Sequence, residues 1–577
     1  MAVMDRPNIV WLLVDSVRRY PTVQDYRGRL PMMERFGKHS IEFLNVVTSA
    51  PSTIMSISAM MTGLPSYFLA RNYDDFRFDN RYFVCLNDIL KRHGYVSYAF
   101  LRGQETREKF RSLVDPIPRK YWAPHLRHGY KWTNQDLNLV LKRMLEAGIP
   151  RPAFLFFHYN PHTPRIDPET SDRVETAVHM LLEAGLTYEN TIYVLCSDHG
   201  FPDPSTGITT EWEIQNRLSH DLVLTDDNIM IPLYIRYPAC QPRRIETTIS
   251  SLDIMPTLLD LAGIGLDPKL RHVMVGRSLL PLIRGQDVED GNNRFFRCDA
   301  RLLYQTGRVT AIRNETYKYV RFHDRFAIAQ QRRKGDIPEA FYDLTVDPLE
   351  QNNLVSSTRE AVREKMVEFR KAFRETERRA FRLQVDYLLS LLEQRASRRH
   401  FKPRVRHNGS RLLLALEPRT GSYGAIALEV VARAYPQAQV DVLFHKDHQD
   451  ELDWLGRRTV HLYQLDQVGD AYRPVDVAGM PSYDLILVIV MNPADPAQQK
   501  LIHLSRQLDS AHVLVLDCNM NVYSRRRYWY YRLRALWRRT HYFWQEPSLL
   551  WRELQTDLRF VRKRIALRLG RHERWTA

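Results

Sequence analysis

Short, mostly apolar runs recur along the first half of the chain and alternate with amphipathic segments. Four of these runs have the length of a buried strand, namely residues 8–14, 95–100, 153–159 and 191–196. Apolar positions at helical spacing lie at residues 30–39, 87–94, 135–147 and 172–184. Buried strands that alternate with amphipathic helices are typical of α/β proteins. We therefore predict a doubly wound, mainly parallel sheet with helices on both faces.

The pattern changes in the second half of the chain. Residues 295–355 are rich in arginine and aromatic side chains, and their strand-like alternation predicts a small antiparallel subdomain. The charged stretch that follows lacks glycine and proline and predicts a long helix, and further on a second, Rossmann-like α/β unit is expected. The predicted parts are a catalytic domain over 1–355, a helical linker over 356–400, an accessory domain over 401–522 and a basic aromatic helical tail over 523–577.

Residues 50–63 form an apolar run that carries small hydroxyl side chains and ends in Thr62-Gly63. A hydroxyl at the start of such a run lies where a loop becomes a helix, and the N–H groups of a helix N-terminus attract anions. A hydroxyl nucleophile that attacks phosphorus or sulfur needs this setting, together with a metal ion or a base. The alternative is an N-capped core helix without chemistry, because Ser and Thr are common cap residues.

Metal-ligand side chains directly follow two of the predicted strands. Asp15 comes after the first strand, and Asp198 and His199 come after the strand 191–196. Open α/β sheets bind ligands at the carboxyl ends of their strands, so these groups and the Thr53 hydroxyl are candidates for one divalent ion. Zn²⁺ or Mn²⁺ suits such a mixed oxygen and nitrogen donor set better than Ca²⁺ or Mg²⁺.

Two further histidines are candidates for acid–base chemistry. His162 lies in a proline-flanked turn after the strand 153–159, and His220 lies in a polar loop before the next apolar run. Either could donate to the non-bridging oxygens of an ester or protonate its leaving group. The alternative for each is a structural histidine beside a strand.

Several motifs in succession resemble the sulfatase family of the alkaline phosphatase superfamily over about residues 5–355. The motifs occupy residues 6–15, the run ending in Thr62-Gly63, 157–164, 197–200, His220 twelve residues before Pro232, 252–263, 275–279 and 342–354. This resemblance implies an alkaline phosphatase-like fold and a metal-dependent hydrolase or transferase. It also implies that Thr53, His162 and His220 are catalytic residues.

The chain departs from the sulfatase pattern at the nucleophile. Sulfatases oxidise a Cys or Ser to formylglycine within a Cys/Ser-x-Pro-x-Arg motif. Counting back nine residues from Thr62 reaches Thr53, and neither the Pro nor the Arg follows it. A threonine cannot become formylglycine. The resemblance therefore implies the branch with an unmodified Thr nucleophile, in which phosphoryl and phospho-alcohol transfer predominate, with Ser52 as the less favoured nucleophile.

The ligand positions also depart from the pattern. Ser16 follows Asp15 where sulfatases commonly have paired Asp, Asn160 stands where they have Asp, and Ser219 where they have Lys. Fewer carboxylates imply a single divalent ion of the transition-metal kind. Its ligands would be Asp15, Thr53, Asp198 and His199.

We therefore predict an enzyme that acts on a phosphate or sulfate ester, glycan-linked or lipid-linked, through a covalent intermediate on Thr53. Phosphoryl or phospho-alcohol chemistry is favoured. One alternative is a sulfuric ester hydrolase that works without formylglycine. Another is an inactive sulfatase-like scaffold that binds anionic glycans or lipid head groups.

The basic charge is concentrated at one end of the chain. Residues 524–577 carry a net charge of +11 out of +16 and interleave Arg with Tyr, Trp and Phe, which suits an anionic membrane surface. A solvated basic helix is the alternative, and nucleic acid is disfavoured because no DNA-binding or RNA-binding module is recognisable. Neither a signal peptide nor an apolar run of about 18 residues is found. We expect a cytoplasmic protein, or one peripheral on the inner face of the membrane.

Overall fold

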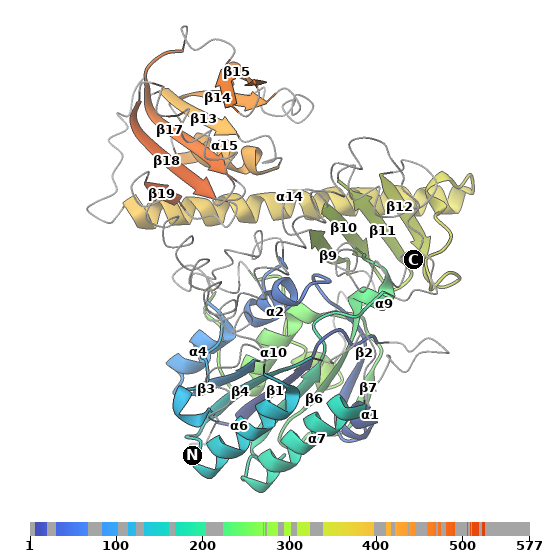
Figure 1. Cartoon of the computed structure of the whole chain (residues 1–577). Coiled ribbons are helices and arrows are strands. Elements are labelled where there is room, and N and C mark those ends of the chain that lie inside the picture. The colour runs from blue at the N-terminus through green and yellow to red at the C-terminus, as the bar shows by residue number, and fades with distance from the viewer. Residues whose placement is uncertain are drawn as a thin grey trace, which may run out of the picture. The chain divides into compact units, whose positions relative to one another are not determined.

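A computed structural model divides the chain into two compact units, Met1–Leu392 and Glu393–Ala577 (Figure 1). No helix in the described part of the chain has both the length and the apolar character needed to cross a bilayer. The structure describes residues 6–19, 31–66, 84–101, 113–122, 132–160, 168–202, 223–268, 271, 274–286, 294–301, 308–323, 338–396, 411–416, 422–434, 436, 438–445, 459–468, 471–474, 480–490, 505, 508, 510–517 and 522–524.

The first unit is built on an eight-stranded sheet with the order β3-β4-β1-β5-β6-β2-β7, in which β8 also pairs with β2. Its strands are β1 (Asn8–Val14), β2 (Ile41–Val47), β3 (Val96–Leu101), β4 (Ala153–Tyr159), β5 (Thr191–Cys196), β6 (Met230–Arg236), β7 (Arg243–Ile245) and β8 (Ile249–Ser250). Strands β3, β4, β1 and β5 are parallel, and β6 is antiparallel to both of its neighbours. The predicted mainly parallel sheet is confirmed.

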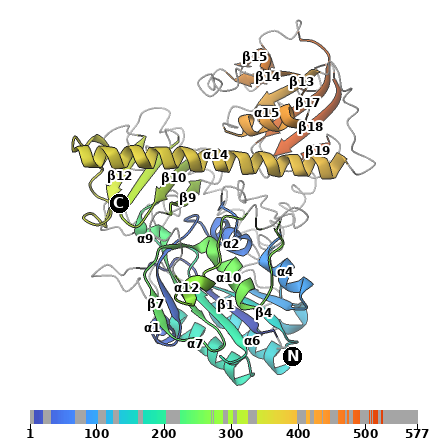
Figure 2. The same cartoon turned by 180° about the vertical axis from the view of Figure 1, so that it is seen from behind.

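Helices cover both faces of this sheet (Figures 1 and 2). Strand β1 is buried throughout, and it sends Trp11 and Leu13 into one core and Val10 and Leu12 into the other. The first core includes α2 (Thr53–Thr62), α4 (Leu86–Arg92) and α10 (Ile254–Leu261), and the second includes α1 (Pro31–Gly37), α6 (Asn134–Glu146) and α7 (Pro168–Glu183). Short elements complete this part, namely η1 (Arg119–Tyr121), α9 (Asp226–Ile229), η5 (Ser251–Asp253) and α12 (Leu280–Ile283).

A four-stranded antiparallel sheet forms the predicted subdomain of the first unit. Its order is β12-β11-β10-β9. The strands are β9 (Phe296–Arg301), β10 (Arg308–Arg313), β11 (Tyr317–Phe322) and β12 (Glu339–Asp343), followed by η6 (Leu354–Ser356) and α14 (Glu360–Ala396). Phe369 and Phe373 of α14 are buried against Ile312 and Tyr319 of this sheet. The first turns of the helix that was expected as a linker therefore contribute to a core of the first unit.

The second unit has a seven-stranded sheet with the order β16-β15-β14-β13-β17-β18-β19. Its elements are β13 (Arg411–Leu416), α15 (Ser422–Ala434), β14 (Gln439–His445), β15 (Thr459–Val468), β16 (Ala471–Pro474), β17 (Tyr483–Val490), β18 (Ser510–Asp517) and β19 (Val522–Ser524). The five inner strands are parallel and the two edge strands are antiparallel to their neighbours. This order of parallel strands is Rossmann-like, as predicted.

The start of the C-terminal tail differs from its predicted helical state. Tyr523 and Ser524 belong to β19, where they pair with Val515 and Leu514 of β18. The physical reason is that β18 would otherwise present an unpaired edge, and the returning chain satisfies its backbone groups. The rest of the tail lies outside the described residues.

Candidate metal centre and active site

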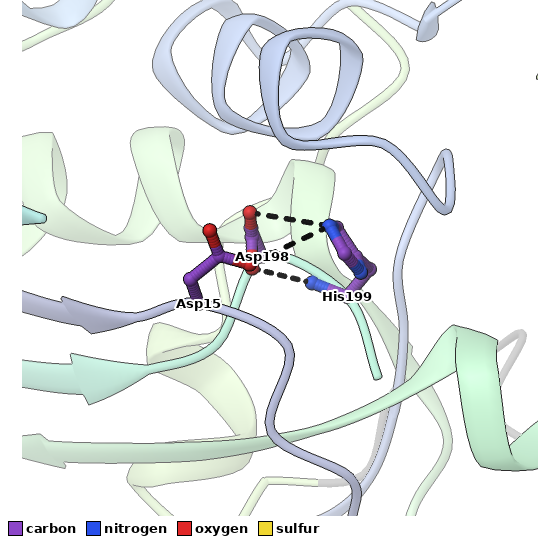
Figure 3. A group of neighbouring side chains, drawn as sticks. All are labelled: Asp15, Asp198 and His199. Carbon is purple, nitrogen blue, oxygen red and sulfur yellow. Dashed lines mark hydrogen bonds and ion pairs between the residues drawn. The ribbon is translucent and has the colours of Figure 1, made fainter. Parts of the chain in front are cut away.

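Three ligand side chains meet at the carboxyl ends of two adjacent strands. Strands β1 and β5 are parallel neighbours, with Leu13 opposite Cys196, so the residues that follow them lie side by side. Figure 3 shows Asp15 on one strand end facing Asp198 and His199 on the other. All three residues are buried, and their ligand atoms lie within 4.8 Å of one another. The proximity expected from the sequence is therefore present.

Hydrogen bonding determines the state of the His199 ring. Its Nδ1 lies 2.7 Å from the carbonyl oxygen of Gly200. Because a carbonyl can only accept, Nδ1 must carry the proton, and in the neutral ring Nε2 presents its lone pair. That Nε2 lies 3.5 Å from Oδ2 of Asp198 and 3.8 Å from Oδ1 of Asp15.

The donor set fits a divalent cation. Oδ2 of Asp198 is buried and has no hydrogen-bond donor among the described residues. An imidazole lone pair beside two buried carboxylates is unfavourable unless a proton or a cation lies between them. Two carboxylates, one imidazole and a nearby hydroxyl are ligand types that Zn²⁺ and Mn²⁺ accept. The residues present therefore fit the divalent metal that sulfatase-type chemistry requires.

The predicted nucleophile lies next to this cluster. Thr53 is the first residue of α2, and its Oγ1 is 3.3 Å from Nε2 of His199. Ser52, the alternative nucleophile, is the N-cap residue and is buried, whereas Thr53 is partly exposed. The first backbone N–H to bond within the helix is that of Ser56, so the N–H groups of residues 53–55 have no intrahelical acceptor. The helix N-terminus can thus stabilise an anion beside the Thr53 hydroxyl.

Hydroxyl side chains that the sequence analysis missed connect α2 to the metal ligands. Thr48 and Ser56 both donate to the backbone carbonyl of Asp198, each at 2.7 Å, and their own hydroxyl groups are 2.8 Å apart. Ser197 accepts from the N–H of Val17 at 2.9 Å and so joins the two strand ends. Of these residues, Ser56 belongs to the hydroxyl run 50–63, whose density of Ser and Thr is the signal in the sequence, whereas Thr48 and Ser197 lie outside that run.

Asp15 is surrounded by polar groups from the ends of β1 and β4. Ser16 Oγ and Asn160 Nδ2 each donate to its carboxylate at 2.6 Å, and His158 Nε2 lies 3.5 Å from Oδ2. Ser16 has φ of 62°, the left-handed region, and its N–H donates to Asp198 Oδ1 at 3.1 Å. A non-glycine residue in this region costs about 1–2 kcal/mol, and such strain is characteristic of functional sites.

The two carboxylates of the site differ in their proton affinity. Burial raises the pKa of Asp15, but contacts with His158 and His199 and the Ser16 hydroxyl outweigh it, and the pKa lies well below its usual range. Burial also raises the pKa of Asp198, and there the neighbouring charges do not compensate, so the pKa stays above its usual value. Asp198 is therefore the ligand that most needs a cation to remain ionised.

The segment after the ligands is held by close packing. A Cβ on Gly200 would lie 2.1 Å from the carbonyl oxygen of Asp227, so no other residue fits without moving the backbone. The buried guanidinium of Arg18 donates to the carbonyl oxygens of Phe201 and Pro202. The segment that follows His199 is thus hydrogen-bonded to the segment that follows β1.

The structure brings together four of the six predicted site residues. Asp15, Thr53, Asp198 and His199 form one cluster, and His162 and His220 lie outside the described residues. Their roles stay predictions. The polar residues at the end of the apolar run 153–159 could have pointed to His158, which is buried beside Asp15.

Two family profiles and several curated sulfatases match this chain. A family profile described as sulfatase matches residues 7–184, and one described as N-sulphoglucosamine sulphohydrolase, C-terminal, matches residues 219–376. An ulvan-active sulfatase of Formosa agariphila is 23% identical over 423 residues, which are 61% of this chain and 77% of that protein. Arylsulfatase K of Mus musculus is 21% identical over 460 residues, which are 62% of this chain and 77% of that protein.

A crystal structure of a sulfatase-like protein from Bacteroides thetaiotaomicron has a TM-score of 0.50 and 16% sequence identity, over 65% of this chain and 93% of that one. At this identity the likeness concerns the fold. The two family profiles cover most of both sheets of the first unit and include Asp15 and Thr53, whereas β5, Asp198 and His199 fall between the two matched ranges. The chain belongs to the sulfatase family of the alkaline phosphatase superfamily, and it is an ester hydrolase of that family.

Proposed function

We propose that the first unit is a metal-dependent enzyme that cleaves a phosphate or sulfate ester with Thr53 as an unmodified nucleophile. The observation that carries this proposal is the Thr53 hydroxyl, partly exposed at a helix N-terminus and 3.3 Å from His199 within the ligand cluster. Ser52 is buried at the neighbouring position and is a poorer candidate. Hydrolysis and transfer to an acceptor alcohol use the same first step.

Asp15, Asp198 and His199 would hold the divalent ion, and Thr53 Oγ1 would complete its ligands. When bound, such an ion lowers the pKa of a coordinated hydroxyl and polarises the ester. Ser16 and Asn160 hold the Asp15 carboxylate in place, and Thr48 and Ser56 hold the Asp198 backbone. We propose Zn²⁺ or Mn²⁺ because the set contains an imidazole and few carboxylates.

In the proposed first step, the Thr53 hydroxyl loses its proton to solvent, and Oγ1 attacks phosphorus or sulfur while the bond to the leaving oxygen breaks. The leaving alcohol takes up a proton, for which His162 and His220 are the proposed donors. The free N–H groups at the start of α2 stabilise the charge on the equatorial oxygens. Water or an alcohol then cleaves the Thr53 ester and returns the hydroxyl.

Phosphate esters are the favoured substrates on the chemistry of the nucleophile. The hydrated aldehyde of a formylglycine can release a bound sulfate by elimination. A threonine ester cannot eliminate in this way. Thr53 therefore has to be freed by a second nucleophilic attack, for which we favour phosphorus as the centre. Sulfate esters are the second candidate, because the relatives named above are an ulvan-active sulfatase and an arylsulfatase. Both candidates suit a glycan-linked substrate.

The test compares the purified full chain with Thr53→Ala and the matched control Ser52→Ala. Metal content is measured by mass spectrometry, and turnover is assayed on an aryl phosphate, a phosphodiester and an aryl sulfate. We expect one bound divalent ion. Thr53→Ala should lower kcat by at least about a thousandfold, as is usual for a nucleophile, while Ser52→Ala should keep most of it.

Two outcomes would contradict the proposal. If no metal copurifies and Thr53→Ala matches the unchanged chain on every ester, the scaffold alternative stands. If Ser52→Ala loses activity and Thr53→Ala does not, the nucleophile is Ser52. A phosphate or sulfate found on Thr53 by peptide mass spectrometry after rapid acid quench would identify both the nucleophile and the ester.

A further inference from the structure

A second cavity of the first unit lies away from the metal centre and is rich in arginine. It has a volume of about 570 Å³ and lies where α10, the segment 274–278, β9 and α14 approach one another. Val275 and Gly276 in its wall bond to the carbonyl of Gly63, which follows the C-terminal end of α2. Thr53 begins the same ten-residue helix, so the cavity is about 15 Å from the nucleophile along the helix axis.

A buried carboxylate holds the wall of this cavity in place. Asp253 is fully buried and accepts from the backbone N–H of Ser250 at 2.9 Å and of Arg277 at 2.8 Å. It also accepts two bonds from the Arg294 guanidinium, at 2.9 and 3.0 Å. These bonds fix the backbone of Arg277 and the guanidinium orientation of Arg294 in the protein without ligand. Less conformational entropy is then lost when a ligand binds.

Close backbone packing gives the same wall further rigidity. A Cβ on Gly276 would lie 2.0 Å from the carbonyl oxygen of Leu252, so this position requires glycine. The N–H groups of Val275 and Gly276 donate to one carbonyl oxygen, that of Gly63, at 3.1 and 3.2 Å. The segment that presents Arg277 is thus anchored on both sides.

The charge of the cavity favours an anion. The side chains that line it include four arginines and one aspartate, namely Arg271, Arg277, Arg294, Arg379 and Asp260. Asp253 behind the wall balances Arg294. Among the described lining residues, positively charged side chains thus outnumber negatively charged ones, and planar guanidinium groups bind the oxygens of sulfate and phosphate in pairs. Apolar surface from Pro256, Met274 and Phe295 lies beside them and can contact a sugar ring.

We propose that this arginine pocket is a second anion site, separate from the metal centre, that binds a sulfate or phosphate group. The group is either free in solution or carried on a sugar, and the two sources share the same tetrahedral oxyanion. Binding here needs neither Thr53 nor the metal ligands. The proposal therefore stands or falls independently of the proposed nucleophile.

The experiment uses the full chain and the double variant Arg277→Gln/Arg379→Gln. Equilibrium dialysis is carried out with radiolabelled sulfate and, separately, phosphate. We expect the double variant to bind one anion fewer per chain than the unchanged protein, with the affinity of the lost site reduced at least about tenfold. Turnover of a small aryl ester should be unchanged, because neither arginine contacts the metal centre.

Arg378→Gln is the control matched to the Arg379 substitution, since it removes one positive charge from the preceding position of α14 and lies outside the pocket lining. Equal loss of binding in this control, or as many anions bound by the double variant as by the unchanged protein, would overturn the proposal. If the double variant proves unfolded by circular dichroism, Arg379→Gln alone replaces it, because this side chain is exposed and its loss leaves the Asp253 wall intact.

A third arm separates the two sources of the anion. N-acetylglucosamine 6-sulfate and unsulfated N-acetylglucosamine are compared with inorganic sulfate in the same dialysis. Tighter binding of the sulfated sugar than of sulfate, lost in the double variant, assigns the site to a glycan-borne group. Equal binding assigns it to the free anion, and binding of the unsulfated sugar alone would overturn the proposal.

Discussion

Two buried clusters of charge in the first unit differ in how their carboxylates are balanced. In the metal centre, neither Asp15 nor Asp198 pairs with a Lys or Arg among the described residues, and only histidines face them. In the second cluster, Lys318 lies 2.5 Å from Asp226 and 2.6 Å from Glu350, and Arg313 also pairs with Asp226 at 2.5 Å. Within the described part of the chain, the carboxylates of both clusters are buried or half-buried, but only those of the second cluster are balanced by Lys or Arg.

The difference distinguishes the candidate metal site from a cluster in which ion pairs balance the buried charge. Burial raises the pKa of Asp226, but the charges of Arg313 and Lys318 outweigh it and keep the pKa below its usual value. Burial raises the pKa of Asp198 too, and there the effect persists. Carboxylates that remain uncompensated inside a protein cost several kcal/mol, so they are retained where an ion from outside completes the charge balance.

The largest effect is expected when the metal centre loses a carboxylate. Asp198→Asn should remove the bound ion and lower kcat/KM by about a thousandfold, or about 4 kcal/mol. The chelator-treated variant should melt at or above the temperature of the chelator-treated unchanged protein, because a buried charge without a partner has been removed. Metal analysis and calorimetry check both parts. If the chelator-treated variant melted at a lower temperature than the chelator-treated unchanged protein, the proposed difference between the two clusters would be wrong.

The second cluster should respond in the opposite direction. Asp226→Asn leaves Arg313 and Lys318 with too little negative charge, and the free energy of unfolding should fall by about 3 kcal/mol. Urea denaturation measures it, with the exposed Glu34→Gln as the control that changes charge without changing a buried pair. Metal content should stay at one ion per folded chain. A variant as stable as the control would show that the pairing adds nothing.

A smaller effect is expected from the groups that orient Asp15. Asn160→Ala removes the 2.6 Å hydrogen bond to the carboxylate and should weaken metal affinity about 10-fold to 100-fold. Competition with a coloured chelator measures the affinity. The fold should be unaffected in the metal-loaded protein. Unchanged affinity would mean that Ser16 alone is sufficient to hold Asp15.

The smallest effect, taken per pH unit, is a pH dependence of stability that comes from the second cluster. Burial, and after it repulsion from Asp226, raises the pKa of Glu350 to about 7 from an ordinary 4.5. The folded state therefore binds this proton more tightly than the unfolded state, and stability should fall as pH rises from about 4.5 to 7. The slope is at most about 1.4 kcal/mol per pH unit. Glu350→Gln should flatten this part of the curve, and an identical slope in the variant would assign it to other groups.

Much of the fold and part of the site could be predicted from local sequence. The buried strands β1, β4 and β5 are continuous apolar runs, and their ends revealed Asp15, Asp198 and His199. The choice of Thr53 came from the resemblance to sulfatases, whose nucleophile lies nine residues before the position of Thr62. His158 and Asn160 could not be assigned, because their role depends on β4 lying beside β1, which no local pattern encodes.

By itself, the sequence determined the kinds and order of the elements and the ligand types at the strand ends. These depend on side-chain periodicity over a few residues. Only the tertiary structure decided which carboxylates are compensated, that Ser52 is buried while Thr53 is partly exposed, and that Arg277, Arg294 and Arg379 line one cavity. Charge balance and burial depend on groups brought together from distant parts of the chain. The hydroxyl run 50–63 thus forms a helix whose first residue, Thr53, lies 3.3 Å from His199 because the tertiary structure brings the end of β5 beside it.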